Sequence, residues 1–477
     1  MASDSVLVID SSHLSDSKKL IREKIIPWEG LARAGIITND QADLFKVLEA
    51  QNAESKRETI LSSEEMYTKT ILNLLNKLDV NSRDDVLKSV LVLINDLLVD
   101  EKAQSFCDAL LSLSSIDSSL PYNPFIKHLE NNDSLIKTLS FYNLVILLSK
   151  SSKAHVSVDK EILIKLFDLV CSPAFIGNPS DRNLQSIGVQ FLQELVIRKE
   201  YRTVFQENNL VSNFKSVNEL IDHSAKQPNA TNLQLLYNAL MCIWILSFSS
   251  SINKVLVHNF PQLVGNLLTI SKDGIKLKVV RVAVSTLKNF ISVVNSNAEQ
   301  FSVVKLVLFH DGLNVVKTVQ TRKFASNGSD EELSNDLQYL SDTLSEVVTS
   351  KLTSLDEYLV ELENPNLLSW SSPTHKSSEF WQENAYKFKD SNYALVKKIL
   401  SILMSDDSSL SGVSKVILLN DLQFLIKNLG SDLITFINSE KNGQYKLLIM
   451  NFLENNGGNN ELKYEALRTI QYLVGHA

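Results

Sequence analysis

The sequence predicts an all-α fold in which pairs of helices stack into a long and then a shorter solenoid. Only 14 Gly and 9 Pro occur among 477 residues, so positive-φ turns and strand breakers are scarce. Amphipathic helical segments recur at a nearly constant interval, with apolar residues three and four positions apart, as at Leu87, Leu91, Ile94 and Leu98. These apolar stripes are too wide for one helix pair to bury alone, which predicts that neighbouring pairs stack.

The repeat is clearest in five segments that we predict to be the second helix of each pair. They begin near Val86, Leu135, Leu184, Leu233 and Val279, which are 49, 49, 49 and 46 residues apart. Helix pairs that recur about every 40–47 residues are typical of HEAT and armadillo repeats, so slightly longer loops are expected here. We therefore predict that residues 1–350 form an N-terminal armadillo/HEAT-like solenoid, a right-handed superhelix. The first helices of the pairs are expected at 71–78, 125–129, 162–170, 214–221 and 263–270.

The repeat breaks once, near residue 350. Ser329-x-x-Glu332 and Ser354-x-x-Glu357 both match the capping box that starts a helix, and they lie close enough to require a stop between them. Similar helices then begin at Val413 and Leu462, again 49 residues apart, which predicts a C-terminal armadillo/HEAT-like domain over residues 355–477. So short a connection permits reorientation of two rigid bodies, and we interpret it as a hinge. The hinge is assigned to Lys351, Leu352, Thr353 and Ser354.

One polar turn in the second body is bounded by two of the chain's four tryptophans. It is the stretch WSSPTHKSSEFW, from Trp370 to Trp381, between a helix expected at 356–368 and a helix with Ser378 as its N-cap. On one interpretation the two indole rings cover the top of the second core, and Pro373 fixes the chain reversal. On the other, the exposed tip contacts a partner protein while the tryptophans hold the turn in place. The two interpretations are compatible.

Two loops of the second body supply the candidate interface residues. His375 could titrate near neutral pH, but a loop histidine with no identified partner is expected to be solvated. The loop at 406–412 is acidic and rich in Ser, so it is either a partner contact or a solvated connector. The candidate interface residues are Thr374, His375, Lys376, Asp406, Asp407 and Ser408.

Charge and apolar runs indicate a protein that binds other proteins. The chain carries 47 Lys and Arg against 55 Asp and Glu, a net charge of −8, with the basic residues scattered. This distribution argues against binding nucleic acid or an anionic membrane surface. No apolar run approaches the roughly 18 residues that span a bilayer, so direct membrane insertion is not expected. Cys107, Cys171 and Cys242 lie in apolar helical patterns, which is typical of buried thiols in a reducing compartment such as the cytosol.

Sequence motifs for nucleotide binding, zinc hydrolysis and serine hydrolysis are absent. The sequence contains no G-x-x-x-x-G-K-[ST], no H-E-x-x-H and no G-x-S-x-G, so we expect no catalytic, cofactor-binding or metal-binding residues. An armadillo-type peptide or cargo adaptor, or a scaffold, is the alternative function. Such receptors hold peptides with a Trp-x-x-x-Asn ladder, and none of the four tryptophans has Asn four positions on. An enzyme hidden in a helical shell is the third hypothesis, and only turnover by the isolated chain would support it.

Four segments carry a resemblance to a known family. They are WEGLAR at Trp28–Arg33, FLQEL from Phe191 followed by EYR at Glu200, LDEYLVEL from Leu355 leading into the tryptophan-bounded turn, and KYEAL at Lys463–Leu467. In this order along nearly the whole chain, they resemble the H subunit family of the vacuolar-type proton-pumping ATPase (V-ATPase). The residues that anchor the resemblance are Trp28, Trp370, Pro373, Trp381 and Tyr464.

The resemblance implies a regulatory role without catalysis. It implies a large and a smaller helical-repeat domain joined by a short linker. It further implies a component of the cytosolic V1 sector that bridges the peripheral stalk, formed by the E and G subunits, and the membrane-sector a subunit. The central rotor or the catalytic hexamer is a further implied partner. Such a component is needed for the activity of the assembled pump and for silencing ATP hydrolysis in the detached V1 sector. The expected location is the cytosolic face of the vacuolar membrane, and the cytoplasm when V1 is detached.

Overall fold

The computed structural model of the protein is all-α, as the repeat predicts. It describes residues 6–78, 83–117, 119–153, 158–207, 210–227, 232–323, 330–350, 355–365, 368–370, 372–405, 412–454 and 459–475. Within these ranges there is no β-strand. Among the helices so described, none combines the length and apolar character that a membrane span needs. Backbone contacts divide the chain into two compact units, Met1–Asn266 and Leu267–Ala477.

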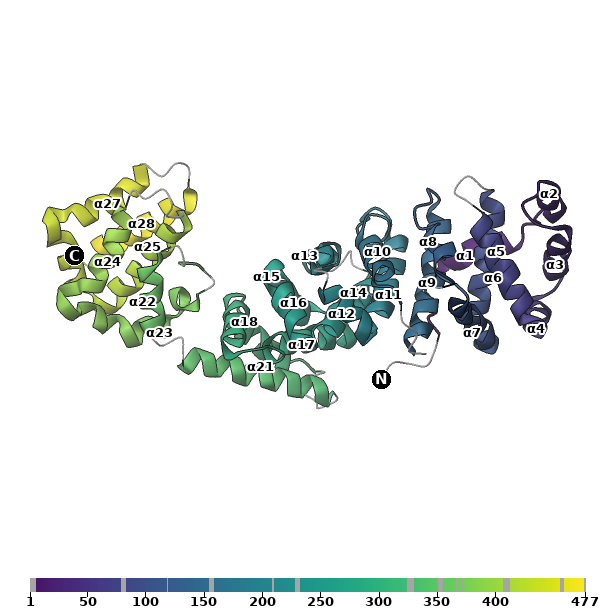
Figure 1. Ribbon diagram of the computed structural model, residues 1–477. Helices are drawn as coiled ribbons and strands as arrows, with labels where there is room; N and C mark the ends of the chain where they lie inside the picture. Colours follow the sequence, from purple (N-terminus) through teal and green to yellow (C-terminus); the bar gives the residue numbers. More distant parts are fainter. Residues whose placement is uncertain are drawn as a thin grey trace. The chain divides into compact units, whose positions relative to one another are not determined.

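The first unit is a succession of helices joined by turns and short 3-10 segments. Its α-helices are α1 (Ser12–Arg22), α2 (Trp28–Arg33), α3 (Asn39–Glu49), α4 (Ala53–Ser62), α5 (Glu64–Lys77), α6 (Asp84–Val99), α7 (Gln104–Ser112), α8 (Asn123–Ile126), α9 (Ser134–Lys153), α10 (Lys160–Cys171), α11 (Arg182–Ile197), α12 (Lys199–Glu207), α13 (Lys215–Lys226), α14 (Leu233–Leu246) and α15 (Ser250–Asn259). The second helices predicted in this part of the chain are confirmed as α6, α9, α11 and α14. Figure 1 shows them in succession along the first unit.

Side-chain caps fix where several of these helices begin. Asp181 before α11 and Asn232 before α14 each accept hydrogen bonds from two backbone N–H groups of the first turn. Thr38 before α3 forms a complete capping box with Gln41. The first N–H groups of a helix have no partner within the helix, so these side chains stabilise the starts that the sequence encodes.

The apolar stripe on each second helix forms the core of the first unit. Leu87, Leu91 and Ile94 of α6 are fully buried, and this helix lies beside α9. Phe141 of α9 stacks on Phe191 of α11, with ring centroids 4.9 Å apart. Burying a large apolar side chain stabilises the fold by roughly 1.5–3 kcal/mol, so repeated burial along the stack accounts for the cohesion of this unit.

A buried polar contact also joins neighbouring repeats. Asn95 of α6 donates its Nδ2 to Oδ1 of Asn143 in α9 over 2.8 Å, and Asn143 donates its Nδ2 to the Leu91 carbonyl over 3.1 Å. Both amides are inaccessible to solvent. A buried polar group without a partner costs about 1–3 kcal/mol, so this pair favours one mutual position of the two helices.

The apolar run Val6–Ile9 near the start of the chain lies against the chain's own helices. The Tyr142 hydroxyl of α9 accepts a hydrogen bond from the Ile9 N–H over 3.0 Å and donates one to the Leu7 carbonyl over 2.9 Å. The Gln190 side chain of α11 accepts a hydrogen bond from the Asp10 N–H over 2.8 Å and donates one to the Asp10 carbonyl over 3.3 Å. The N-terminal segment is therefore held through its backbone.

The second unit contains the end of α16 and the helices that follow it. Its bounds are α16 (Gln262–Asp273), α17 (Leu277–Ser292), α18 (Asn297–Phe309), α19 (Gly312–Gln320), α21 (Glu331–Ser350), α22 (Leu355–Glu363), η6 (Pro373–Lys376), α23 (Ser378–Asn384), η7 (Ala385–Lys389), α24 (Asp390–Met404), α25 (Gly412–Leu429), α26 (Ser431–Ser439), α27 (Gln444–Glu454) and α28 (Asn460–Val474). The helices predicted near Val279, Val413 and Leu462 are confirmed as α17, α25 and α28. The predicted hinge at 351–354 lies outside the described residues.

Two predicted helix ends need correction. The helix expected to reach residue 368 ends at Glu363, because Pro365 disfavours the helical conformation of the residue before it. The N-cap of α23 is Ser377 rather than Ser378. The Ser377 hydroxyl accepts a hydrogen bond from the Phe380 N–H over 3.1 Å.

The C-terminal body, residues 355–475, has an apolar core of its own. Trp381 is fully buried at its centre, with Tyr358 edge-on at 5.2 Å and Phe424 stacked at 6.1 Å between ring centroids. Trp370 is partly buried and packs against the same core. The tryptophans that bound the turn therefore contact one core, as the structural interpretation of the turn predicted.

All three cysteines are buried and unpaired, as their apolar surroundings predicted. Burial raises the pKa of the Cys107 and Cys171 thiols to about 12 and also raises the pKa of Cys242. A thiol with so high a pKa is almost entirely protonated near neutral pH and reacts slowly.

Candidate functional site

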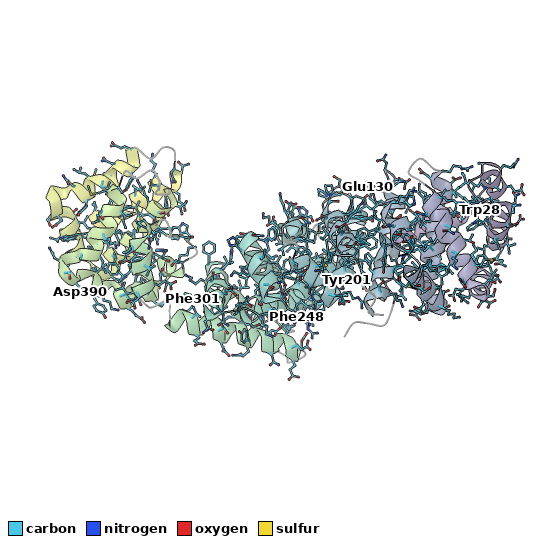
Figure 2. All side chains as sticks on the ribbon, in the orientation of Figure 1. Trp28, Glu130, Tyr201, Phe248, Phe301 and Asp390 are labelled. Atoms are coloured by element: carbon cyan, nitrogen blue, oxygen red, sulfur yellow. The ribbon has the colours of Figure 1, made fainter. Side chains whose placement is uncertain are left out.

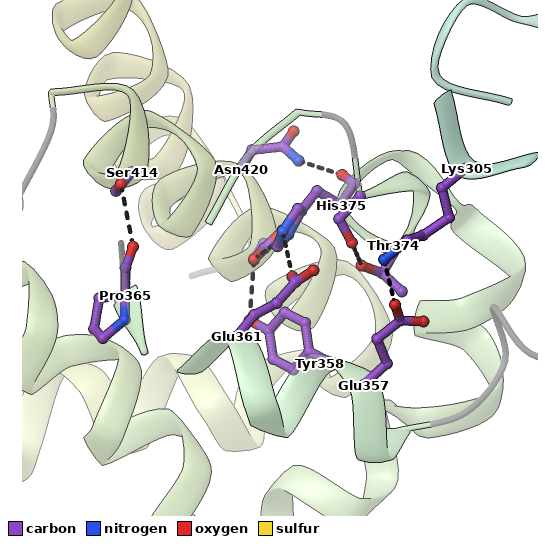
Figure 3. Close-up of polar contacts among 11 residues, drawn as sticks. Lys305, Glu357, Tyr358, Glu361, Pro365, Thr374, His375, Ser414 and Asn420 are labelled. Carbon is purple, nitrogen blue, oxygen red and sulfur yellow. Dashed lines mark hydrogen bonds and ion pairs between the residues drawn. The ribbon is translucent and has the colours of Figure 1, made fainter. Parts of the chain in front are cut away.

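The tryptophan-bounded turn forms a 3-10 segment, η6, between α22 and α23. The Ser372 and Thr374 hydroxyls hydrogen-bond each other over 2.6 Å inside the turn. Asn420 of α25 donates its Nδ2 to the His375 carbonyl over 2.6 Å (Figure 3). One local hydroxyl–hydroxyl bond and one bond from a distant helix to the backbone thus hold the turn.

The His375 side chain lies in a buried cluster of ionisable groups. Its Nδ1 is 2.8 Å and 3.0 Å from the two carboxylate oxygens of Asp421 in α25. Its Nε2 approaches Oε2 of Glu361 in α22 to 3.0 Å, at an angle that does not meet hydrogen-bond geometry. The Tyr358 hydroxyl donates to Asp421 Oδ2 over 3.0 Å. Figure 3 shows Tyr358 and Glu361 of α22 beside His375 of η6, and Asp421 is supplied by α25.

Two carboxylates determine the charge of the histidine. Burial alone would lower the pKa of His375, but the charge and hydrogen bonds of Asp421, together with Glu361, raise this pKa to about 9. Burial and the Asp421 charge raise the pKa of the Tyr358 hydroxyl well above its ordinary value, so Tyr358 stays a neutral donor. Near neutral pH His375 is therefore an imidazolium, held between the side chains of Asp421 and Glu361.

The cluster is suited to holding elements together. Among the residues that the structure describes, the polar partners of the His375 side chain are the carboxyl groups of Asp421 and Glu361, and neither is a hydroxyl or thiol nucleophile. In the part of the chain that the structure describes, no group of three or more His, Cys, Asp or Glu side chains is arranged to hold a metal ion. Removing one partner of a buried ion pair costs about 3–5 kcal/mol, because the remaining charge is left without compensation. We interpret the cluster as a structural clamp that fixes the turn on the core.

The predicted exposure of the tip is wrong for Thr374 and His375. Both residues are 0% exposed, whereas Lys376 is exposed. The physical reason is the pairing of His375 with Asp421, which lies far away in the sequence. Only a weak signal could have indicated it, namely the polar pair Asn420-Asp421 inside the otherwise apolar stretch VILLNDLQFLI.

The exposed Lys376 has aromatic neighbours that the sequence did not predict. Its ammonium lies 4.6 Å from the ring centroid of Phe309 in α18 and 5.3 Å from that of Trp370. A second basic residue of α18, Lys305, donates a hydrogen bond to Glu357 Oε1 of α22 over 2.6 Å (Figure 3). The surface beside the buried cluster therefore contacts α18.

Comparison with known proteins identifies the family. Two family models, both described as the V-ATPase H subunit, match residues 12–344 and residues 351–477. The chain belongs to the V-ATPase H subunit family. The V-type proton ATPase H subunit of Dictyostelium discoideum is 24% identical over 471 residues, covering 98% of this chain and 95% of the relative. The H subunit of Drosophila melanogaster is 24% identical over 481 residues, with coverages of 98% and 92%. A probable H subunit of Oryza sativa subsp. japonica is 25% identical over 485 residues, with coverages of 98% and 97%.

Solved structures give weaker likenesses. A chain from a structure titled for the interaction between cadherin and beta-catenin aligns over 97% of both chains, with 14% sequence identity and a TM-score of 0.44. An importin beta structure covers 96% of this chain and 55% of its own, with 10% identity and a TM-score of 0.34. At these low scores the alignments carry no argument about function.

Membership of the H subunit family establishes the general role. The H subunit is a non-catalytic, regulatory part of the V-ATPase, a proton pump, and it works with the other subunits of that complex. The expectation that the chain has no catalytic activity of its own is therefore confirmed by its relatives.

The family anchors occupy different environments in this H subunit. Trp28 is 5% exposed and stacks on Phe45 with centroids 4.5 Å apart, among the helices at the start of the chain (Figure 2). Pro373 opens η6. Tyr464 of α28 is 58% exposed, so its side chain does not serve the core. The candidate interface residues Asp406, Asp407 and Ser408 lie outside the described residues.

Proposed function

We propose that this member of the H subunit family acts as a mechanical bridge that both couples and brakes its pump. In the assembled V-ATPase it joins the peripheral stalk, through the E and G subunits, to the membrane-sector a subunit at the cytosolic face of the vacuolar membrane. In the detached V1 sector the C-terminal body turns about residues 351–354 and contacts the central rotor or the catalytic hexamer. That contact silences ATP hydrolysis.

The observation that carries this proposal is the division of the family match into two parts. One model ends at residue 344 and the next begins at residue 351, the first residue of the predicted hinge, so the second match contains the hinge residues. The second part has its own buried core, formed by residues between Tyr358 and Leu473. A body that has its own core and a short connection to the rest of the chain can change orientation without unfolding.

Braking of this kind requires that the chain fit and bind both the moving and the fixed part of the pump. It requires no catalytic step in this chain. A rotary motor stops when any rigid body joins its moving part to its fixed part. Resisting torque requires several contacts at once, and stacked helix pairs present the long continuous surfaces that such contacts need. A braking role therefore agrees with a fold in which the buried cluster around His375 serves to hold helices together.

Two surfaces of the C-terminal body are our candidates for the contact that brakes the pump. The first is the acidic loop with Asp406, Asp407 and Ser408. The second is the exposed side of the tryptophan-bounded turn at Lys376. Thr374 and His375 support the second surface from inside, because their side chains are buried.

A reconstitution with separate bodies tests the proposal. Residues 1–352, residues 353–477 and the full chain are each added to a pump preparation that lacks its H subunit. We expect the long fragment to bind the complex and support hydrolysis, and the short fragment to be required for silencing the detached V1 sector. The full chain is the positive control. If either fragment alone performed both tasks, the proposed division of labour would be refuted.

A further inference from the structure

Basic and aromatic side chains of α18 contact two elements of the C-terminal body. Lys305 pairs with Glu357, in the first turn of α22, at 2.6 Å. The Lys376 ammonium lies over the ring of Phe309, the last residue of α18. Within α18, the Lys305 ammonium also lies 4.9 Å from the Phe301 ring centroid. Two independent contacts thus join α18 to the body that follows residues 351–354 in the chain.

Each contact residue of the C-terminal body adjoins a buried anchor. Glu357 directly precedes Tyr358, and Lys376 directly follows His375. Tyr358 and His375 are both 0% exposed and both hydrogen-bond Asp421. The core therefore holds the backbone of the two contact residues before they meet α18, which lowers the conformational entropy lost on contact.

The contact is polar and partly exposed to solvent. The side chains of Lys305 and Glu357 are 27% and 23% exposed. An exposed ion pair or cation–π contact changes an equilibrium constant by only about two- to five-fold. Contacts of this strength favour one arrangement of two bodies and still allow them to separate. They differ in this respect from the buried core around Trp381, which keeps its own body intact.

We propose that the Lys305–Glu357 pair and the seat of Lys376 on Phe309 form a reversible latch between α18 and the C-terminal body. Hereafter these four residues are called the latch. The partner of the exposed side of the tryptophan-bounded turn is then α18 of the same chain in the closed arrangement. This inference deepens the proposed function, on which its biological consequence rests: opening the latch releases the body that brakes the pump.

The test measures the distance between the two sides of the latch in the full chain. Spin labels are attached at Lys317→Cys in α19 and Asn451→Cys in α27, both exposed positions. The three native cysteines are buried, so labelling is selective for the introduced thiols. Pulsed electron paramagnetic resonance then gives the populations of the closed and open arrangements.

Charge reversal on each side of the latch gives the decisive variants. Lys305→Glu and Glu357→Lys each replace an attraction by a repulsion, and the double variant restores the attraction with its direction reversed. The matched control is the pair Lys389 and Asp432, which lies within the C-terminal body at 2.6 Å with both partners exposed. Lys376→Ala removes the cation–π contact from an exposed position where misfolding is not expected.

We expect each single reversal to lower the ratio of closed to open molecules by about five-fold or more, and the double variant to return it towards the wild-type ratio. Lys376→Ala should lower the ratio by about two- to five-fold. Reversals at Lys389 and Asp432 should leave it unchanged. Wild-type distance distributions in Lys305→Glu, Glu357→Lys and Lys376→Ala would overturn the latch, and so would a double variant as open as the singles.

A second measurement separates the latch from the proposed function. The same variants are added to the detached V1 sector, and ATP hydrolysis is recorded. Variants that open the latch should change the degree of silencing, and the double variant should restore it. If the distances respond as expected while silencing does not change, the latch stands and the braking role fails.

Discussion

Deprotonation of His375 should destabilise the C-terminal body between pH 6.5 and pH 9.5. The pKa of this histidine is about 9 in the folded protein and 6.5 as its ordinary value. The folded state therefore holds the proton more tightly than the unfolded state does. The stabilisation is fully present below pH 6.5 and is lost as the pH rises through 9. A difference of about 2.5 in pKa corresponds to about 3 kcal/mol of unfolding free energy.

Hydrogen exchange of the α25 amides measures this loss in the full chain. The rates are corrected for the intrinsic effect of pH, and wild type is compared with His375→Gln, which cannot carry the charge. The free energy of opening should fall by about 3 kcal/mol more in the wild type than in the variant over this range. In Asp421→Asn the pKa of His375 should drop, because the main partner that raises it is removed. His223→Gln, at an exposed position, is the control. Equal pH dependence in wild type and His375→Gln would refute the reasoning.

Three further outcomes are expected. Trp381→Ala should lower the unfolding free energy of the C-terminal body by about 3–5 kcal/mol, whereas Tyr464→Ala should change it by about 0.5 kcal/mol or less. Denaturant unfolding measures both values, and equal losses in the two variants would contradict the assigned burial of Trp381. Tyr142→Phe removes the hydroxyl that bonds the backbone of Leu7 and Ile9, so exchange of the Ile9 amide should accelerate while the amides of α9 keep their protection. Thiol reagents should modify the native chain slowly and the denatured chain fully, and fast native labelling would contradict the burial of Cys107, Cys171 and Cys242.

The helical repeat could be predicted because its signal is local. Apolar residues spaced three and four apart define a helix without reference to the rest of the chain, and their recurrence about every 49 residues placed α6, α9, α11 and α14 correctly. Helix ends were less certain because they depend on single residues. Pro365 ended α22 earlier than expected, and Ser377 rather than its neighbour became the cap of α23.

The environment of the turn could not be predicted in the same way. A histidine in a polar loop normally meets water, and only folding brings Asp421 and Glu361 against His375. The contact of Lys376 with Phe309 joins η6 to α18, and the repeat in the sequence does not indicate that these two elements meet. What the sequence did indicate was that the turn is unusual, because two tryptophans bound it.

The paired amides of Asn95 and Asn143 bear on how the first unit carries a load. Sliding one helix past the other by a single turn, roughly 5.4 Å, would break both hydrogen bonds that Asn143 makes with α6 and the bond that Asn95 Nδ2 donates, at a cost of about 1–3 kcal/mol for each buried group left without a partner. Only Asn95 Oδ1 would keep a partner, because it also accepts from Lys18 Nζ over 2.6 Å. Shear between these two layers is therefore opposed at small displacements. A force applied at one end of the stack of helices would therefore be transmitted to the other end with little sliding between α6 and α9.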